Sequence, residues 1–310
     1  QQFLLKTSLL ERLTAPLCDE VTGQSSSQTM LETLEGRNLF LVSLDSKRSW
    51  YRYHSLFADF LRKLLWCQNP DIPSVLRYRA SRWYESHGFM AEAIEQALSC
   101  SDWKRVVQIA EPISERMIAQ GHHVTLQRWL QALPAEVMQA HLHLSINYIW
   151  TLVHTGQIDA CELTLQAVEM MCRNTGNERK RGEIFLIRST LASSDGELDL
   201  ALSFAQQAQE YISEHDIHQQ VILNFVQARA YMLVGDVLHA QRHAKKVHIL
   251  SETVGDYVGV IQAIRLLGDI EVLNGELYAA ITCYQHGIQL PMNPSFGWIR
   301  AYFHFQLVNI

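Results

Sequence analysis

His54 is the residue of this sequence best placed to bind an anion. It stands directly before a run whose apolar residues recur with helical spacing, so we expect it in the first turn of a helix. Its imidazole has a donor nitrogen, and the N–H groups and dipole at a helix N-terminus also attract negative charge. A capping or partly buried histidine without a ligand is the alternative, and the residues themselves leave both open.

Other groups of reactive side chains have simpler interpretations. His239 and His243 are four residues apart on an expected helix and could turn two nitrogens toward a metal, but no third ligand is near, which favours a solvated helix face. The basic run 179–181 could contact phosphate, yet acidic residues flank it and its composition favours a solvated loop. No serine or cysteine has a base beside it in a local motif, so the sequence predicts no enzyme.

The composition is that of a globular protein with about two domains. Of 310 residues, 48% are hydrophobic and 19% are charged, which is enough to bury a large core. The net charge of −6 attracts neither nucleic acid nor an anionic membrane, so we expect neither partner. Six scattered cysteines without a C-x-x-C pair indicate a cytoplasmic protein. Because the chain starts without methionine inside an expected helix, we expect a piece of a longer protein.

Residues 1–66 have the order of elements of a winged-helix domain. Helices are expected at 3–13, closed by Pro16, and at 27–35, closed by Gly36. Strand-like residues at 39–44 and 50–53 flank a polar turn and predict a hairpin, the wing. A helix then follows from His54. Its predicted apolar stripe consists of Leu56, Phe57, Phe60, Leu61, Leu64 and Leu65.

Residues 67–74 contain two prolines without apolar periodicity and are expected to be a linker. Beyond it we expect only helices: an arm of irregular hairpins over 75–140 and a regular array over 141–310 that is cut in mid-repeat. The array is predicted from glycines followed five residues later by a small residue. The glycines are Gly88, Gly156, Gly196, Gly235 and Gly275, and the small residues are Ala93, Cys161, Ala201, Ala240 and Ala280.

The last four glycines are 40, 39 and 40 residues apart, which is the spacing of a repeat. Glycine accepts the positive φ at which a helix ends and the chain turns back, and a small residue in the next helix lets two backbones approach. The result is a helical hairpin. The spacing resembles that of the tetratricopeptide repeat with longer helices, so the predicted fold is mainly α: a small winged-helix domain followed by a right-handed α-solenoid.

Residues 1–66 also resemble a known family through FLLKTSLLERL, LETLEGRNLFLVSLD and WYRYHSLFADFLR. These segments look like the winged-helix region of the large ATP-dependent regulators of the LuxR superfamily, the MalT-like class. Residues 78–110 resemble the helical arm that follows it there. The resemblance implies a middle segment of a signal-responsive transcription activator, with ATP or ADP as the cofactor of the full-length parent. We expect no cofactor in this segment, because no P-loop motif occurs in it.

The resemblance gives His54 a specific role. In the wider class of signalling ATPases, the histidine of a Met-His-Asp motif at the start of the last winged-helix helix reaches the β-phosphate of ADP. Tyr53, His54 and Ser55 occupy that place here. Ser55 departs from the aspartate of the motif. His54 is therefore the expected nucleotide contact of the full-length parent.

A signal site is expected on the concave face of the 183–275 repeats, where the first helix of each hairpin lines the inside. The candidate residues for an inducer or partner surface are Phe225, Arg229, Gln262, Arg265 and Asp269. Charged and amide groups beside an aromatic face suit a small polar ligand. The alternative is an inter-repeat salt bridge between Arg229 and Asp269, which are equivalent positions one repeat apart.

The favoured function is a signal-sensing and coupling module. The array would bind a small-molecule inducer or a regulatory protein, and the winged helix would pass the result to the nucleotide-binding module of the same parent chain. DNA binding by the winged helix is the second hypothesis, but its expected recognition helix carries Glu32 and Glu35 and no base. A protein-binding scaffold without a small ligand also stays open.

Overall fold

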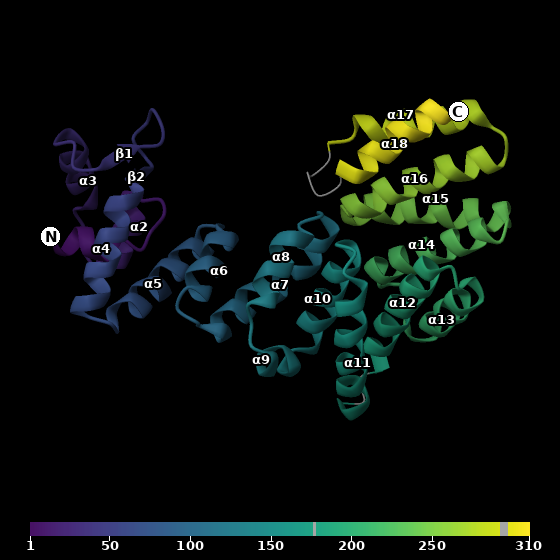
Figure 1. The fold of residues 1–310 in the computed structure, drawn as a ribbon, viewed down its shortest axis with the longest axis horizontal. Helices are drawn as coiled ribbons and strands as arrows, with labels where there is room; N and C mark the ends of the chain where they lie inside the picture. Colours follow the sequence, from purple (N-terminus) through teal and green to yellow (C-terminus); the bar gives the residue numbers. More distant parts are fainter. Residues whose placement is uncertain (176–177, 292–296) are drawn as a thin grey trace. The chain divides into compact units, whose positions relative to one another are not determined.

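The computed structural model describes residues 1–175, 178–291 and 297–310. The chain divides into two compact units, Gln1–Pro112 and Ile113–Ile310. Both are almost entirely helical, which confirms the predicted fold class (Figure 1). The elements up to the unit boundary are α1 (Gln2–Thr7), α2 (Ala15–Thr22), α3 (Ser27–Gly36), β1 (Leu41–Ser43), β2 (Tyr51–Tyr53), α4 (Ser55–Gln68), α5 (Ile72–Ser86), α6 (Met90–Leu98) and α7 (Trp103–Ala119), which crosses it. No helix among the described residues is both long and apolar enough to cross a membrane.

The winged helix contains one helix more than the sequence predicted. The expected 3–13 helix ends at Thr7, and Leu13 instead forms a β-bridge with Tyr51 that extends the antiparallel β1–β2 hairpin. Pro16 opens α2 rather than closing the previous helix. Proline fits the first helical turn because the N–H that it lacks would have no partner there. Thr14 caps the same helix through its side-chain oxygen, which accepts from the N–H of Leu17 at 3.3 Å.

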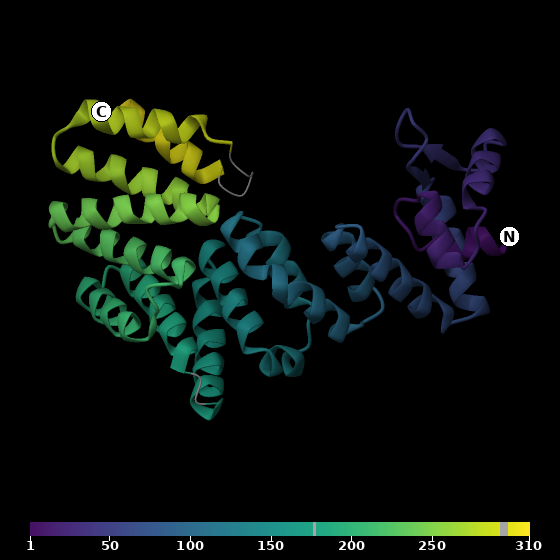
Figure 2. The same cartoon turned by 180° about the vertical axis from the view of Figure 1, so that it is seen from behind.

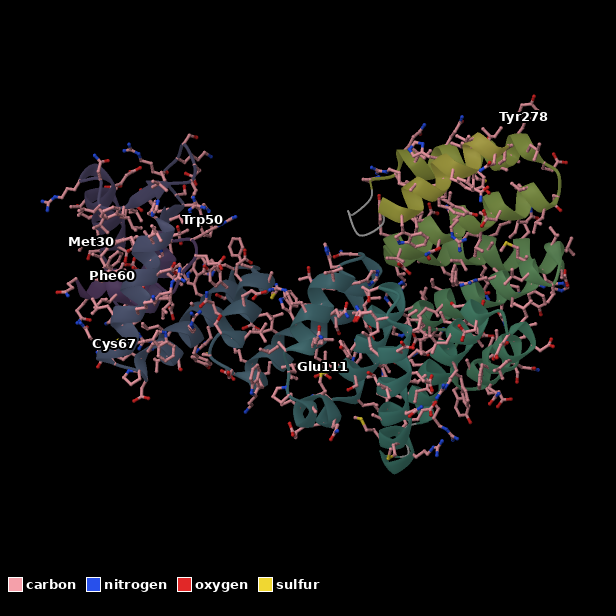
Figure 3. The ribbon with its side chains drawn as sticks, viewed as in Figure 1. Met30, Trp50, Phe60, Cys67, Glu111 and Tyr278 are labelled. Atoms are coloured by element: carbon pink, nitrogen blue, oxygen red, sulfur yellow. The ribbon has the colours of Figure 1, made fainter. Side chains whose placement is uncertain are left out.

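The apolar stripe of α4 is narrower than predicted. Ala58, Leu61 and Leu65 are buried, whereas Leu56 is 74% and Phe60 is 60% exposed. Figure 3 labels Phe60 on the winged-helix unit. The predicted stripe joined two neighbouring rows of residues on the helix, and only the row spaced three and four residues apart packs against the domain.

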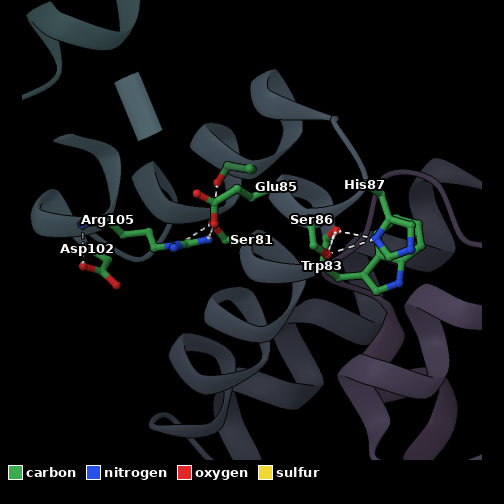
Figure 4. A network of polar contacts seen from close by, with 8 residues as sticks. Ser81, Trp83, Glu85, Ser86, His87, Asp102 and Arg105 are labelled. Atoms are coloured by element: carbon green, nitrogen blue, oxygen red, sulfur yellow. Dashed lines mark hydrogen bonds and ion pairs between the residues drawn. The ribbon is translucent and has the colours of Figure 1, made fainter. Parts of the chain in front are cut away.

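The first hairpin after the winged helix is α5–α6, and polar contacts join it to α7. Arg105 of α7 donates to the hydroxyl of Ser81 at 3.1 Å and forms an ion pair with Glu85, both on α5 (Figure 4). Ser81 in turn donates its hydroxyl hydrogen to the carbonyl of Ala93 on α6 at 2.8 Å. The three helices are therefore connected through one buried guanidinium and one hydroxyl.

The second unit consists of helical hairpins that lie side by side in both views of the molecule (Figures 1 and 2). Its elements are α8 (His123–Gln131), α9 (Ala135–Ala140), α10 (Leu142–His154), α11 (Ile158–Thr175), α12 (Glu178–Asp195), α13 (Leu198–Tyr211), α14 (Ile217–Leu233), α15 (Val237–Val254), α16 (Tyr257–Leu273), α17 (Leu277–Gln289) and α18 (Gly297–Asn309). The predicted turn glycines have φ between 72° and 81°. The small residues predicted five positions later are all fully buried, so the proposed hairpin geometry is confirmed.

The basic run is part of a helix and not of a loop. Lys180 and Arg181 lie in the first turn of α12, while the side chain of Arg179 lies outside the described residues. The Lys180 ammonium pairs with Glu183 at 2.6 Å, and the Arg181 guanidinium lies 5.5 Å from the centre of the Tyr211 ring. The composition around this run suggested a loop, but Glu183 pairs with Lys180 three residues earlier on one helix.

Candidate functional site

The second unit contains a cavity of about 670 Å³. With the exception of Val247 on α15, its walls come from α7 and from the first helices of the hairpins, α10, α12, α14 and α16, together with the residues that cap α14 and α16. Its polar lining residues are Glu115, His143, Asn147, His154, Lys180, Glu183, Thr190, Asp216, His218, Gln219, Asp256 and Gln262. The first helices thus line the inside, as tetratricopeptide-like packing predicts.

A chain of polar contacts joins α12 to α14 at this wall. The Lys180 ammonium and the Gln219 amide both donate to Oε1 of Glu183, at 2.6 and 2.7 Å. Burial raises the pKa of Glu183 above its ordinary value, and Lys180 partly offsets that effect. The Gln219 hydrogen bond thus joins α14 to a buried carboxylate on α12.

Glu115 and Asp256 add two further carboxyl groups. Glu115 of α7 lies 2.9 Å from Nε2 of His143 on α10, and this contact lowers the pKa of Glu115. Asp256 caps α16, because its Oδ1 accepts from the N–H of Gly259 at 2.9 Å. Burial raises the pKa of Asp256. A side chain at Gly259 would collide with Ser251 and Asp256, so the cap depends on that glycine.

Trp150 and Phe225 give the cavity aromatic surface. Phe225 also packs against the core clusters of the array, so only part of its ring is free. A cavity with aromatic surfaces and a few fixed polar groups has the composition of a site for a small polar molecule.

The structure separates the five predicted surface residues. Phe225 and Gln262 line the cavity, and Arg229, Arg265 and Asp269 do not. Asp269 accepts from the hydroxyls of Tyr284 and Tyr302 at 2.8 and 2.6 Å, and from Arg265 at 3.2 Å. The salt bridge considered between Arg229 and Asp269 is therefore absent: Asp269 pairs with an arginine one turn away on its own helix.

The candidate His54 is exposed at the start of α4. Its backbone N–H donates to the carbonyl of Phe40 at 2.7 Å, while its side chain makes no capping hydrogen bond. The imidazole is thus accessible at the N-terminus of a 14-residue helix. This position is compatible with an anion contact.

The histidine pair on α15 is only half solvated. His239 is exposed and 2.7 Å from Asp236, but His243 is stacked on Tyr231 and hydrogen-bonded to Asn224 at 2.9 Å. The prediction of a solvated face is therefore wrong for His243. Within the part of the chain that the structure describes, no group of three His, Cys, Asp or Glu side chains could hold a metal ion.

Sequence reasoning missed most of the polar wall. Glu115, His143 and Gln219 come from helices that are distant along the chain, and no local motif marks them. Lys180 and Glu183 had a signal, because their three-residue spacing suits a pair on one helix. That signal required placing a helix where the composition suggested a loop.

Fold and cavity together define a winged-helix protein with a tetratricopeptide-type repeat array. Comparison with protein families agrees: residues 1–72 match the MalT winged helix domain, and residues 182–296 match the MalT-like TPR region. The chain therefore contains the winged-helix and repeat domains of the MalT-like family, and the resemblance inferred from the sequence is confirmed.

Individual relatives support the same assignment. The chain is 28% identical to the HTH-type transcriptional regulator MalT of Cronobacter sakazakii, over 97% of this chain and 34% of that protein. It is 27% identical to the MalT of Klebsiella pneumoniae strain 342, over 82% of this chain and 27% of the relative. The serine/threonine-protein kinase PknK of Mycobacterium tuberculosis is 29% identical over 55% of this chain and 16% of its own length. The chain thus spans about a third or less of these proteins.

A solved structure has the same fold. It is a signal transduction ATPase with numerous domains and a tetratricopeptide repeat sensor, from Pyrococcus horikoshii. The TM-score is 0.64 over 99% of this chain and 46% of that chain, at 14% sequence identity. At this identity the likeness concerns the fold alone.

Proposed function

We propose that this chain is the signal-sensing and coupling segment of a MalT-like transcription regulator. The repeat array binds a small-molecule inducer, and the winged helix passes the result to a nucleotide-binding module of the parent protein, which uses ATP or ADP. The observation that carries the proposal is the cavity, because its lining comes from four successive first helices. A ligand that contacts several repeats can change how they stack, and so act over a distance.

Binding is the role that suits this cavity. Its volume of about 670 Å³ lies in the range of sites for small molecules, roughly 300 to 1,000 Å³. Its carboxyl groups already pair with Lys180, His143 or helix N-terminal amides, and such fixed groups orient a ligand. LuxR-type transcription control and a cytoplasmic location form part of the same proposal.

Nucleotide contact through His54 belongs to the parent protein. The exposed imidazole at the start of α4 supports it, and so does the motif position. In the full-length regulator, His54→Ala should weaken retention of ADP, measured as the ADP that remains bound after gel filtration. Equal retention in variant and wild type would refute the contact.

Direct DNA contact by the winged helix has less support. The exposed face of α3 presents Glu32 and Met30. Of the two bases near it, Arg37 lies beyond the C-terminal end of the helix, and Arg48 is paired with Glu35 at 3.4 Å. Acidic side chains repel phosphate groups, and apolar side chains do not bind them.

A partner protein is a second candidate occupant of the array, although at a different place. Exposed apolar residues gather at the turns of hairpins α14–α15 and α16–α17: Leu233, Leu238, Leu273 and Tyr278. Figure 3 shows Tyr278, which is 90% exposed, at the outer tip of its hairpin. Such patches are typical of protein interfaces.

A thermal-shift screen of the 310-residue chain tests the sensor role. The panel contains sugars, amino acids, carboxylic acids and phosphate esters, and we expect one class to raise the melting temperature. Gln262→Ala should reduce that shift, because Gln262 lines the cavity. Gln241→Ala is the matched control, since Gln241 bonds to Glu271 and does not line the cavity. No shift with any class, or equal shifts in both variants, would contradict the proposal.

A further inference from the structure

Arg229 of α14 is a half-buried cation without an acidic partner. Among the described residues it makes no hydrogen bond and no ion pair. Its nearest candidate partner, Asp269, already accepts from two tyrosine hydroxyls and from Arg265. A guanidinium that is partly removed from water and left unpaired costs stability, so its presence calls for an explanation.

The surroundings of Arg229 increase this cost. Burial lowers the pKa of Arg229, and the charge of Arg265 on the neighbouring first helix, α16, lowers it further. Arg265 is itself satisfied by Asp269 and by the side chain of Gln262 at 3.0 Å. The positive charge left over on this face therefore belongs to Arg229.

Arg229 also stands next to the cavity. It follows Phe225 by four residues and Ile222 by seven, so the three side chains occupy one face of α14. Phe225 and Ile222 line the cavity. A ligand seated against Phe225 needs to extend by only one helical turn, about 5 Å, to reach the guanidinium.

We propose that Arg229 binds an anionic group, a carboxylate or a phosphate, at one end of the ligand that occupies the cavity. The proposal rests on the sensor role proposed above and adds the chemical class of the ligand. A guanidinium suits both groups because its planar fork donates two parallel hydrogen bonds to two oxygens. Glu183 and Asp256, which also line the cavity, would receive the uncharged or donor part of the same molecule.

Titration calorimetry on the 310-residue chain tests the proposal, with inorganic phosphate and succinate as probes at constant ionic strength. We expect saturable binding of one of them, and which one binds distinguishes a phosphate from a carboxylate ligand. Arg229→Gln should weaken that binding at least tenfold, and Arg229→Lys should weaken it less. Arg242→Gln is the matched control, because it removes the same charge from an exposed position on α15 and should bind as the wild type does.

Thermal melting of the same variants separates binding from a structural role. Because Arg229 has no hydrogen-bond or ion-pair partner among the described residues and is repelled by Arg265, Arg229→Gln should melt at the same or a higher temperature than the wild type. A fall of several degrees would show that Arg229 supports the fold and would overturn the proposal. Unchanged anion binding in Arg229→Gln, or no saturable binding by the wild type, would overturn it as well.

The proposed sensor role can survive that failure. If the compound panel still yields a ligand whose shift depends on Gln262, the cavity is a binding site and only the role of Arg229 is wrong. If the panel yields none, the sensor role itself fails.

Discussion

The hairpins α14–α15 and α16–α17 share one backbone plan and use it differently. Their turn glycines, Gly235 and Gly275, have φ of 81° and 77°, and Ala240 and Ala280 are equally buried. The positions six residues before the turns diverge. Asp269 accepts hydrogen bonds from α16, α17 and α18, while Arg229 makes no hydrogen bond or ion pair among the described residues. The residues that set the backbone repeat are therefore alike in the two hairpins, whereas residues without that role differ.

The packing inside the two hairpins diverges in the same way. Ala228 and Ala244 belong to one core cluster in the first hairpin. The equivalent positions in the second hairpin are Gly268 and Tyr284, and a side chain at Gly268 would collide with the tyrosine ring. Two alanines in the first hairpin thus correspond to a glycine and a tyrosine in the second. Tyr284 thereby reaches Asp269, so packing and polar network changed together.

Removal of Asp269 should have the largest effect on this comparison. Asp269→Ala leaves the buried hydroxyl of Tyr284 without an acceptor and Arg265 without a counter-charge, which costs roughly 3 kcal/mol. Urea unfolding followed by circular dichroism measures the loss. Asp269→Asn keeps one acceptor and should lose less. If Asp269→Ala and Arg229→Gln have equal effects, the contrast between the two hairpins does not exist.

A methyl group at Gly268 should have the next largest effect. Gly268→Ala forces a Cβ into the ring of Tyr284 and should destabilise the array by about 2 kcal/mol, through overpacking. Ala228→Gly is the reciprocal change in the first hairpin. It should cost about 1 kcal/mol, the ordinary penalty of glycine in a helix. A stabilising Gly268→Ala would show that the ring moves aside freely.

The smallest effect is a pH dependence confined to the first hairpin. Burial, and then Lys246 and Arg242, lower the pKa of His243, whereas the equivalent residue of the second hairpin is Cys283. Since the pKa is lower in the folded state, the unfolded chain binds more protons just below the ordinary histidine value of about 6.5. Stability should therefore fall, by less than about 1 kcal/mol, as the pH drops through that value.

Urea midpoints of wild type and His243→Gln at about pH 7.5 and about pH 5.5 isolate this contribution, because the other histidines titrate in both proteins. The wild type should lose more stability than the variant on acidification. An equal loss would assign the pH dependence to other groups.

The hairpin framework was predictable because its determinants are local. A turn with positive φ favours glycine, and close approach of two helix backbones requires a small residue. The spacing of Gly235 and Ala240 therefore predicts the hairpin geometry directly. The extra helix α2 was missed for a local reason too, since Pro16 is compatible with both a helix end and a helix start.

The site was predictable only in part because it depends on how the repeats stack. Phe225 and Gln262, which equivalence of positions predicts on the concave face, line the cavity. The same equivalence also suggested that Arg229 meets Asp269, although two tyrosines from later helices occupy that carboxylate. Which side chains pair between helices depends on side-chain length and on superhelical geometry, and the period of the repeat predicts neither.

Hydrogen–deuterium exchange tests most directly the claim that the first helices form a signal site. The measurement compares the 310-residue chain with and without the compound that most raises its melting temperature. We predict that the compound slows exchange in peptides from α10, α12, α14 and α16, which line the cavity, and leaves α13 and α17 unchanged. Slowed exchange confined to α13, α17 or the winged helix would contradict the account.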